Sequence, residues 1–224
     1  MNSDAALILD FGGVISRTLF ETHELTERAL GLSPGSLTWQ GPFAPESDDL
    51  WTAMQNDKIS EREYWAQRAR ETGRLLGKDW TEMSQFVSAA RGADPESVIR
   101  PEALHAIDAA RKQGAKLAIL SNELDLFYGS EFRSKLPFLD QFEVIADATY
   151  TKTLKPDPRA YLDCARELDV DAHYCVFVDD QQRNVAGAAA VGMKFVKFDV
   201  REPGRSFDMA LSLLETIAKE PEHA

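Results

Sequence analysis

The sequence predicts an α/β fold, a three-layer sandwich around a mostly parallel sheet with an inserted helical domain. From about residue 100 onward, short apolar runs alternate with helical patterns, which is typical of βαβ units and a parallel sheet. One more apolar run, at residues 6–9, stands far ahead of the others. Residues 17–100, which separate it from them, carry helical patterns and no clear strand. The helical segment is therefore expected to interrupt the sheet domain after its first strand.

The strands and helices of the sheet domain follow one another in a regular order. Pro101 and Gly114 bracket a helix, with proline in its first turn and glycine just past its end. A stripe of apolar residues at helical spacing, from Tyr161 to Leu168, predicts a second helix that faces the core. The predicted strands are 6–9, 116–120, 142–146, 175–178 and 194–198, and the later predicted helices are 158–168, 183–191 and 207–217.

The helical insert is recognised by its capping signals. Ser60-x-x-Glu63 and Asp79-x-x-Glu82 both have the spacing of a capping box, in which two side chains satisfy free backbone donors at a helix start. An apolar stripe that begins at Met83 follows the second of them. Residues 1–16 and 101–224 are therefore expected to form one domain, and residues 17–100 a second.

Composition and charge exclude several classes of protein. The 224 residues carry a net charge of −12, which disfavours a general nucleic-acid binder because phosphate backbones require clustered Lys and Arg. No run of 18 apolar residues, the length that a membrane span needs, is present. The N-terminus has Asp4 where a secretory signal carries positive charge. Two cysteines form no disulfide framework, which favours a reducing, cytoplasmic location.

Polar residues follow three of the predicted strands directly. Asp10 comes after the first strand, Ser121 after the second, and the pair Asp179-Asp180 after the fourth. Each is also explained by an ordinary turn or helix cap. Ligands of open parallel sheets bind outside the carboxyl ends of the strands, however, so three such endings together predict a functional site there.

Four short motifs then occur in one order along nearly the whole chain. They are LILDFGGVI, LAILSN, TLKPDPRAY and VFVDDQQRNVAG. In type and order they resemble the haloacid dehalogenase superfamily, whose members are mostly phosphate-ester hydrolases. The resemblance implies a Rossmann-like core at residues 1–16 and 101–224 and a small helical cap domain at residues 17–100.

The resemblance also implies a role for each motif residue. Asp10 is similar to the nucleophile of the family, which attacks phosphorus and forms an aspartyl-phosphate. Mg²⁺ is expected on Asp10, on the backbone carbonyl of Gly12 and on Asp180, where it neutralises the repulsion between carboxylate and phosphate. Asp179 is expected to orient metal-bound water, with direct ligation left open.

Phosphate binding is expected from the second and third motifs. Ser121 and Asn122 resemble the residues that contact the phosphoryl group, and Lys155 the lysine that attracts it. Lys152 is an alternative to Lys155, which the following proline favours. Asn184, four residues after Asp180, is expected to help orient that carboxylate.

Gly12 departs from the common form of the first motif, which has a second aspartate there as general acid and base. Such catalysis contributes about 10²–10⁴-fold. One reading is a phosphatase with another proton source, similar to family members that carry glycine here, including glucose-1-phosphate phosphatases. A second is a metal-free 2-haloacid dehalogenase, because a halide leaves without a proton. A third is a protein that binds a phosphorylated ligand with weak or no catalysis.

The first reading gives the function that we expect. It is Mg²⁺-dependent hydrolysis of a small phosphorylated metabolite, with sugar phosphates among the candidates, and with neither nucleic acid nor membrane as a partner. The sequence leaves the chain open to being a monomer or a homodimer.

Overall fold

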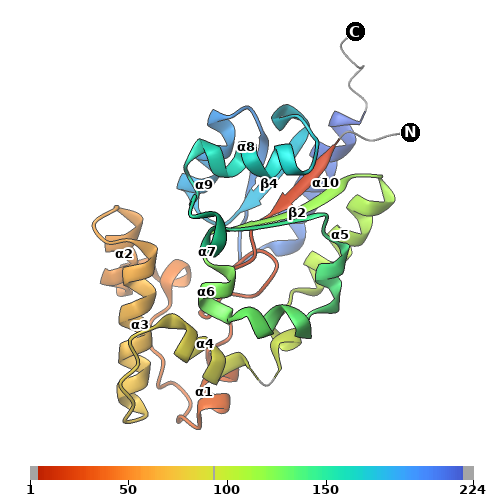
Figure 1. The fold of residues 1–224 in the computed structure, drawn as a ribbon. Helices are drawn as coiled ribbons and strands as arrows, with labels where there is room; N and C mark the ends of the chain where they lie inside the picture. The colour runs from red at the N-terminus through yellow and green to blue at the C-terminus, as the bar shows by residue number, and fades with distance from the viewer. Residues whose placement is uncertain (1–4, 93, 219–224) are drawn as a thin grey trace. The chain divides into compact units, whose positions relative to one another are not determined.

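The protein, described as a computed structural model over residues 5–92 and 94–218, divides into two compact units. Within the described residues, the first unit comprises 5–17, Ile99–Asp125 and 136–218, and the second comprises 18–92, 94–98 and Leu126–Lys135. Figure 1 shows the chain coloured from its N- to its C-terminus.

The first unit is built on a sheet whose five described strands are all parallel, in the order β3-β2-β1-β4-β5. The strands are β1 (Ala6–Leu9), β2 (Lys116–Ser121), β3 (Val144–Asp147), β4 (Cys175–Asp179) and β5 (Lys194–Lys197). The first strand of the chain lies at the centre of the sheet, and each of its residues is fully buried. Such a strand is a continuous apolar run because helices cover both of its faces. The predicted parallel α/β fold is confirmed.

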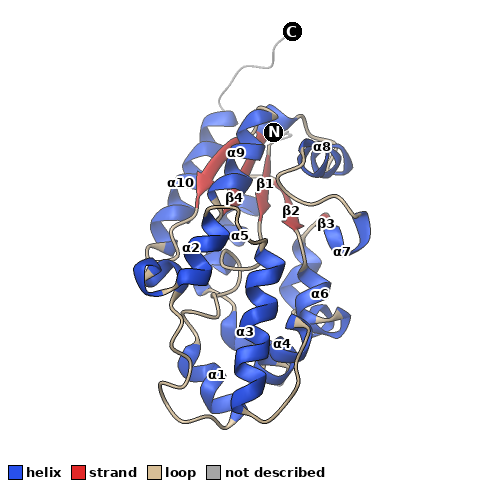
Figure 2. Cartoon of the chain, turned by 90° about the vertical axis from the view of Figure 1, so that its left-hand side faces the viewer, coloured by secondary structure: helices blue, strands red, loops and turns tan. Residues whose placement is uncertain are grey.

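Helices cover both faces of this sheet, which gives three layers (Figure 2). On one face α8 (Pro158–Glu167) and α9 (Gln182–Ala190) pack on the strands, and on the other α5 (Pro101–Lys112) and α10 (Pro203–Ile217) do so. Side chains that alternate along the strands, among them Ile8, Leu120 and Phe177, share a core with α8 and α9. The period of two along each strand thus divides the apolar residues between two cores.

The second unit is helical over its described residues. Its helices are α1 (His23–Leu30), α2 (Asp49–Gln55), α3 (Glu61–Leu75) and α4 (Met83–Arg91). The 3₁₀ turns Gly41–Phe43 and Pro45–Ser47 lie between α1 and α2, and a third, Pro95–Val98, follows α4. The predicted capping box of Ser60 and Glu63 is present at the start of α3. Aromatic rings form much of the core: Phe20 lies edge-on to Trp39 and Trp51, with ring centroids 5.4 and 5.3 Å apart.

Three sequence predictions of local structure were wrong at their boundaries. The capping box expected from Asp79 and Glu82 is formed three residues later, by Glu82 and Gln85 at the start of α4. The strand expected from residue 142 begins at Val144, since the 3₁₀ turn Pro137–Gln141 occupies the chain immediately before it. The helix expected from residue 207 begins four residues earlier, at Pro203.

Short helical segments follow β2 and β3. They are α6 (Leu124–Tyr128), the 3₁₀ turn Ser130–Lys135, and α7 (Ala148–Thr151), and a further 3₁₀ turn, Ala172–Tyr174, precedes β4. Residues 126–135 belong to the second unit, a feature that the sequence analysis did not anticipate. The functional division into a core and a cap at residues 17–100 stays a prediction.

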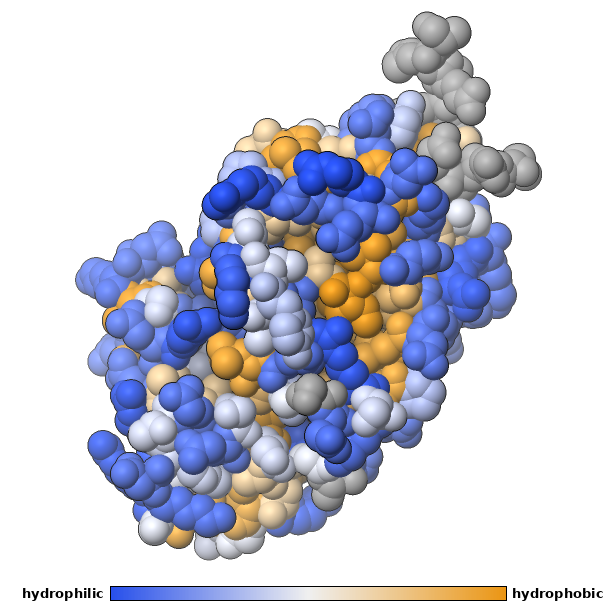
Figure 3. Space-filling view, viewed as in Figure 1, coloured by the Kyte–Doolittle hydropathy of each residue, from blue (hydrophilic) through white to orange (hydrophobic). Residues whose placement is uncertain are grey.

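The surface seen in Figure 3 is mainly hydrophilic, with smaller apolar areas. Large apolar side chains that are exposed, such as Tyr150, Leu75 and Met209, come from separate elements. None of the helices within residues 5–92 and 94–218 combines the length and the apolar character that crossing a membrane requires.

Candidate active site

The polar residues that end the central strands lie at one edge of the sheet. The register of β1 pairs Leu9 with Ile119 of β2 and with Val178 of β4. Asp10 therefore follows β1 at the same end at which Ser121 and Asp179 close their strands. The predicted convergence at the carboxyl edge is present in the structure.

A buried lysine joins the carboxylates at this edge. The Nζ atom of Lys155 lies 2.8 Å from Oδ1 of Asp10 and 2.7 Å from Oδ2 of Asp179. The side chain of Asp179 is fully buried, and that of Lys155 is 1% exposed. Charges this deep are stable only when they are paired, so the lysine and the two carboxylates depend on one another.

The loop that carries Lys155 is fixed by Asn122. The backbone N–H of Lys155 donates to Oδ1 of Asn122 at 2.7 Å, and Nδ2 of Asn122 donates back to the carbonyl of Lys155 at 3.2 Å. The second and third motifs, which are distant in sequence, are thereby held together. Lys152, the alternative lysine, is exposed and its ammonium donates to the carbonyl of Thr149, so the structure brings Lys155 rather than Lys152 to Asp10.

The carboxylate of Asp179 is surrounded by hydrogen-bond donors. Besides Lys155 it accepts from the backbone N–H of Gln181 at 2.7 Å and from Nδ2 of Asn184, which lies 3.1 and 3.0 Å from its two oxygens. Asn184 thus orients Asp179, whereas the sequence analysis expected it beside Asp180. The hydroxyl of Tyr161 donates to the backbone carbonyl of Asn184 at 2.8 Å and holds the first turn of α9 in place.

Three carboxylates form a cluster at the edge. One oxygen from each of Asp10, Asp179 and Asp180 lies within 4.8 Å of the others. Mg²⁺ takes oxygen ligands and is bound by one or two carboxylates together with waters and phosphate oxygens. Lys155 pairs with two of the three carboxylates, and the oxygen donors of the cluster fit a divalent cation.

The pKa values within the cluster reflect burial and pairing. Burial raises the pKa of Asp10 from its ordinary 3.8 to about 7; Lys155 acts to lower it and Asp179 to raise it further. Burial also acts to lower the pKa of Lys155, but the carboxylates of Asp10 and Asp179 outweigh it, so that this pKa lies above its ordinary value. The lysine therefore keeps its proton and favours the ionised form of Asp10, which is the form that can act as a nucleophile.

The loop after Asp10 contains two glycines in different conformations. Gly13 is buried with φ at 84°, a left-handed conformation that favours glycine. Gly12 is exposed and its φ lies outside that range. The guanidinium of Arg100 donates to the carbonyl of Gly13 at 3.1 Å, and the backbone N–H of Arg100 donates to the carbonyl of Ile15 at 3.0 Å. No motif or spacing indicates this contact of Arg100, because the two segments are far apart along the chain.

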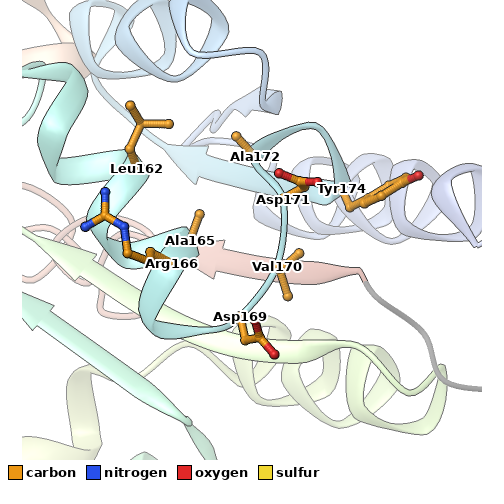
Figure 4. Close-up of a pocket in the computed structure, with 8 residues that line it drawn as sticks. All are labelled: Leu162, Ala165, Arg166, Asp169, Val170, Asp171, Ala172 and Tyr174. Carbon is orange, nitrogen blue, oxygen red and sulfur yellow. The ribbon is translucent and has the colours of Figure 1, made fainter.

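A separate pocket lies near the opposite end of β4, before its first residue (Figure 4). None of the predicted site residues lines it. Its lining comes from α8 and the turn that follows: Leu162, Ala165, Arg166, Asp169, Val170, Asp171, Ala172 and Tyr174. The carboxyl edge, where Asp10, Lys155, Asp179 and Asp180 meet, is therefore the candidate active site.

Comparison with known proteins agrees with this geometry. Residues 5–192 match the model of a hydrolase family, the haloacid dehalogenase-like hydrolases. The YhcW protein of Bacillus subtilis, named as a phosphatase, is 27% identical over 191 residues, which cover 85% of this chain and 81% of that protein. A phosphatase of Mycobacterium tuberculosis is 33% identical over 94 residues, which cover 42% of this chain and 43% of that protein. The match to mouse acyl-CoA dehydrogenase family member 10, at 32% identity, spans 55% of this chain and 11% of that protein.

Solved structures share the fold. A haloacid dehalogenase-type phosphatase from Thermococcus onnurineus has a TM-score of 0.53 at 19% identity, covering 87% of this chain and 86% of its own. The L-2-haloacid dehalogenase of Xanthobacter autotrophicus has a TM-score of 0.55 at 19% identity, covering 87% of this chain and 77% of its own. The same architecture therefore occurs in proteins with different chemistry, and the site has to decide between them.

Proposed function

We propose that this chain, which belongs to the haloacid dehalogenase-like hydrolases, is a Mg²⁺-dependent phosphatase that hydrolyses a small phosphomonoester. The observation that carries this proposal is the ammonium of Lys155, placed between the carboxylates of Asp10 and Asp179. It supplies the positive charge that an anionic substrate needs in an acidic protein. The two relatives named as phosphatases support the same reading.

Asp10 is the nucleophile in this mechanism. One of its oxygens forms a bond to phosphorus while the bond from phosphorus to the leaving oxygen breaks, and the electron pair of that bond stays on the leaving oxygen. Water then attacks phosphorus, the bond to Asp10 breaks, and the free carboxylate returns with inorganic phosphate. Covalent catalysis of this kind divides one difficult displacement into two easier ones.

The other motif residues bind and orient. Ser121 and Asn122 are assigned to the phosphoryl group together with Lys155, which also offsets the negative charge of the cluster. Asp179 accepts hydrogen bonds from Lys155, Gln181 and Asn184, four in all, and these use about the full acceptor capacity of a carboxylate. We therefore assign it to orientation and charge, not to direct metal ligation.

Asp10, the backbone carbonyl of Gly12, and Asp180 would hold the Mg²⁺ ion. When bound, the ion reduces the repulsion between carboxylate and phosphate and stabilises the charge on the transferring group. The exposed backbone of Gly12 and the proximity of Asp10 to Asp180 support this assignment.

The proposed substrate is a small phosphorylated metabolite, with sugar phosphates among the candidates. A net charge of −12 disfavours polyanions such as nucleic acids and anionic membrane surfaces. We assign residues 17–100 to a cap domain that selects the substrate. We also assign the chain to a reducing, cytoplasmic location, because Cys164 and Cys175 are buried free thiols. Both a monomer and a homodimer are compatible with this function.

Hydrolysis of p-nitrophenyl phosphate tests the proposal. We expect turnover with Mg²⁺, its loss with EDTA, and its loss in Asp10→Asn, because the amide cannot act as the nucleophile. Asp163→Asn is the matched control: Asp163 is half exposed on α8 and pairs with Arg166, so this variant is expected to keep full activity. Turnover that survives EDTA and Asp10→Asn would refute the mechanism.

Dehalogenation of a 2-haloacid is the second candidate, and the observation in its favour is the lack of a side chain at Gly12, since a halide leaves without a proton. The pairing of Asp179 and Asp180 beside the nucleophile disfavours it, because these carboxylates would repel the carboxylate of the substrate. Chloride release from 2-chloropropionate in the presence of EDTA, with p-nitrophenyl phosphate left intact, would replace the phosphatase proposal with this one.

A further inference from the structure

We propose that Lys197 is a positioning residue for the metal site: its ammonium holds the main chain of Asp180 so that the carboxylate of Asp180 faces the cation. The inference rests on the proposed function, which assigns Asp180 to Mg²⁺. Lys197 ends β5, and the register of the sheet places it beside Asp179, the last residue of β4. It lies outside the four sequence motifs.

Asp180 differs from the other two carboxylates of the cluster. Asp10 pairs with Lys155, and the fully buried Asp179 accepts four hydrogen bonds. Asp180 is partly exposed and lies one residue past the end of β4, where the chain has left the strand and α9 has not yet begun. The direction of its side chain therefore depends on how its own main chain is fixed.

The two peptide planes that meet at the Cα atom of Asp180 are both fixed by hydrogen bonds. In the plane before it, the carbonyl of Asp179 accepts from the backbone N–H of Phe198 at 2.9 Å. In the plane after it, the N–H of Gln181 donates to Oδ1 of Asp179 at 2.7 Å. The carbonyl of the same plane, that of Asp180, accepts from the ammonium of Lys197. Because peptide groups are planar, fixing both planes fixes φ and ψ of Asp180, and with them the direction of its Cβ.

The ammonium of Lys197 also contacts a segment that is packed in the core. It lies 3.4 Å from the carbonyl of Phe198, the next residue along the chain. The side chain of Phe198 is buried, and its ring centre lies 5.0 Å from that of Phe207 on α10. An exposed lysine thus connects the carbonyl of Asp180 to a fixed part of the sheet domain.

The charge of Lys197 and its contact with Asp180 act on cation binding in opposite directions. An ammonium near the cluster repels a cation, so on charge alone Lys197→Met would strengthen binding. Groups that orient metal ligands contribute about 10–100-fold to metal affinity, so loss of the contact would weaken binding. Mg²⁺ demands near-ideal octahedral geometry, whereas Ca²⁺ accepts flexible sets of oxygens, so Mg²⁺ depends more on a fixed Asp180. The sign of the change, and its difference between the two ions, identify the role.

The test is isothermal titration calorimetry of the full chain, freed of metal with EDTA and dialysed, with MgCl₂ and with CaCl₂. We expect Lys197→Met to weaken Mg²⁺ binding by about tenfold or more, and Ca²⁺ binding by less. Lys197→Arg, which keeps the charge and a donor, should recover part of the Mg²⁺ affinity. Lys194→Met is the matched control, because it removes the same charge from an exposed position on the same strand. This control should bind Mg²⁺ at least as tightly as the native chain.

The melting temperature in EDTA separates positioning of Asp180 from a role in folding. Because the side chain of Lys197 is exposed, we expect Lys197→Met to melt within about 2 °C of the native chain. A loss of Mg²⁺ affinity that comes with a large fall in melting temperature would assign Lys197 to folding and overturn the inference.

Two binding results would also overturn it. Unchanged or tighter Mg²⁺ binding in Lys197→Met would show that the lysine acts through its charge alone, and equal weakening for Mg²⁺ and Ca²⁺ would show that ligand geometry is not what it controls. Failure of the native chain to bind Mg²⁺ would refute the metal assignment, and this inference with it. Because the titration needs no substrate, a native chain that binds Mg²⁺ but does not hydrolyse p-nitrophenyl phosphate would refute the phosphatase proposal alone.

Discussion

At the scale of single residues, the site depends on one buried cation. Lys155 holds two carboxylates that would otherwise repel each other in a nearly dry environment. Removing one partner of a buried ion pair leaves uncompensated charge, which destabilises a protein by about 3–5 kcal/mol. Lys155, which we assign to phosphate binding, is thus also a residue that the folded state needs.

Lys155→Met is therefore expected to lower the free energy of unfolding by about 3–5 kcal/mol when measured in EDTA, and to abolish turnover of p-nitrophenyl phosphate. Urea denaturation followed by circular dichroism gives the first quantity. Lys152→Met is the matched control, because Lys152 is exposed and contacts a backbone carbonyl, and it should change stability by less than about 0.5 kcal/mol. Equal effects of the two substitutions would contradict the assigned role of Lys155.

Asn184 is expected to act on the site through Asp179. Asn184→Ala removes two hydrogen bonds to a fully buried carboxylate and should lower the free energy of unfolding by about 1–3 kcal/mol. Activity should fall through kcat more than through KM, since Asn184 positions charge and does not bind substrate. Asn184→Gln, which keeps the amide but shifts it, should recover less than half of the lost activity. A change confined to KM would contradict this role.

Motif spacing predicted which residues meet at the carboxyl edge of the sheet but not how they pair. The sequence analysis selected Lys155 over Lys152, and the structure pairs Lys155 with Asp10. It expected Asn184 beside Asp180, whereas the amide lies on Asp179. The two carboxylates are adjacent in sequence and both belong to the cluster, so spacing along the chain could not tell which of them Asn184 would contact.

At the scale of elements, the loop that follows β1 determines where Asp10 and the backbone of Gly12 lie. Arg100, immediately before α5, ties this loop down through the carbonyls of Gly13 and Ile15. The side chain is buried and its guanidinium lies 5.5 Å from the ring centre of Phe198. A residue outside the four motifs thus supports the first of them.

Arg100→Met is expected to lower kcat for p-nitrophenyl phosphate at least about tenfold and stability by about 1–3 kcal/mol, because it leaves a buried carbonyl without its donor. Arg100→Lys should restore part of both. Arg111→Met, in the last turn of α5, is the control, since Arg111 is exposed and the described hydrogen bond of its guanidinium is to the side chain of Gln141. Loss of stability with kcat unchanged would assign Arg100 to folding alone.

The predictable part of the fold is the part set by local pattern. The central strands were placed to within one residue because each is a continuous apolar run that ends on a polar residue. The strand at the edge of the sheet, β3, was placed two residues early because Phe142 is apolar but follows a 3₁₀ turn. Residues 126–135 belong to the helical unit because they pack against segments that are distant in sequence, and no local pattern predicts such packing.

At the scale of the whole molecule, two thiols report on folding. Burial raises the pKa of Cys164 and of Cys175 from 9.0 to about 12. In the unfolded chain a thiol ionises near its ordinary pKa, so above about pH 8.5 the unfolded state releases protons that the folded state retains. Stability from these groups is complete below that pH and is lost as the pH rises toward 12.

The melting temperature is therefore expected to fall as the pH increases from 8 to 11, and the slope should be smaller in Cys175→Ala than in the native chain. At pH 8 both thiols should react with Ellman's reagent slowly in the native protein and rapidly in guanidinium chloride, because the thiolate is the reactive form. Rapid reaction of the folded protein, or a melting temperature that stays constant over this range, would contradict the burial of these residues.

Formation of a covalent phosphate on Asp10 is the most direct test of the account. The native protein is mixed with p-nitrophenyl phosphate and Mg²⁺, quenched in acid during turnover, and digested for mass spectrometry. We expect one phosphoryl group on the peptide that contains Asp10, and its absence from Asp10→Asn. Steady turnover without that modification, or phosphate on another residue, would contradict the assignment of Asp10 as the nucleophile.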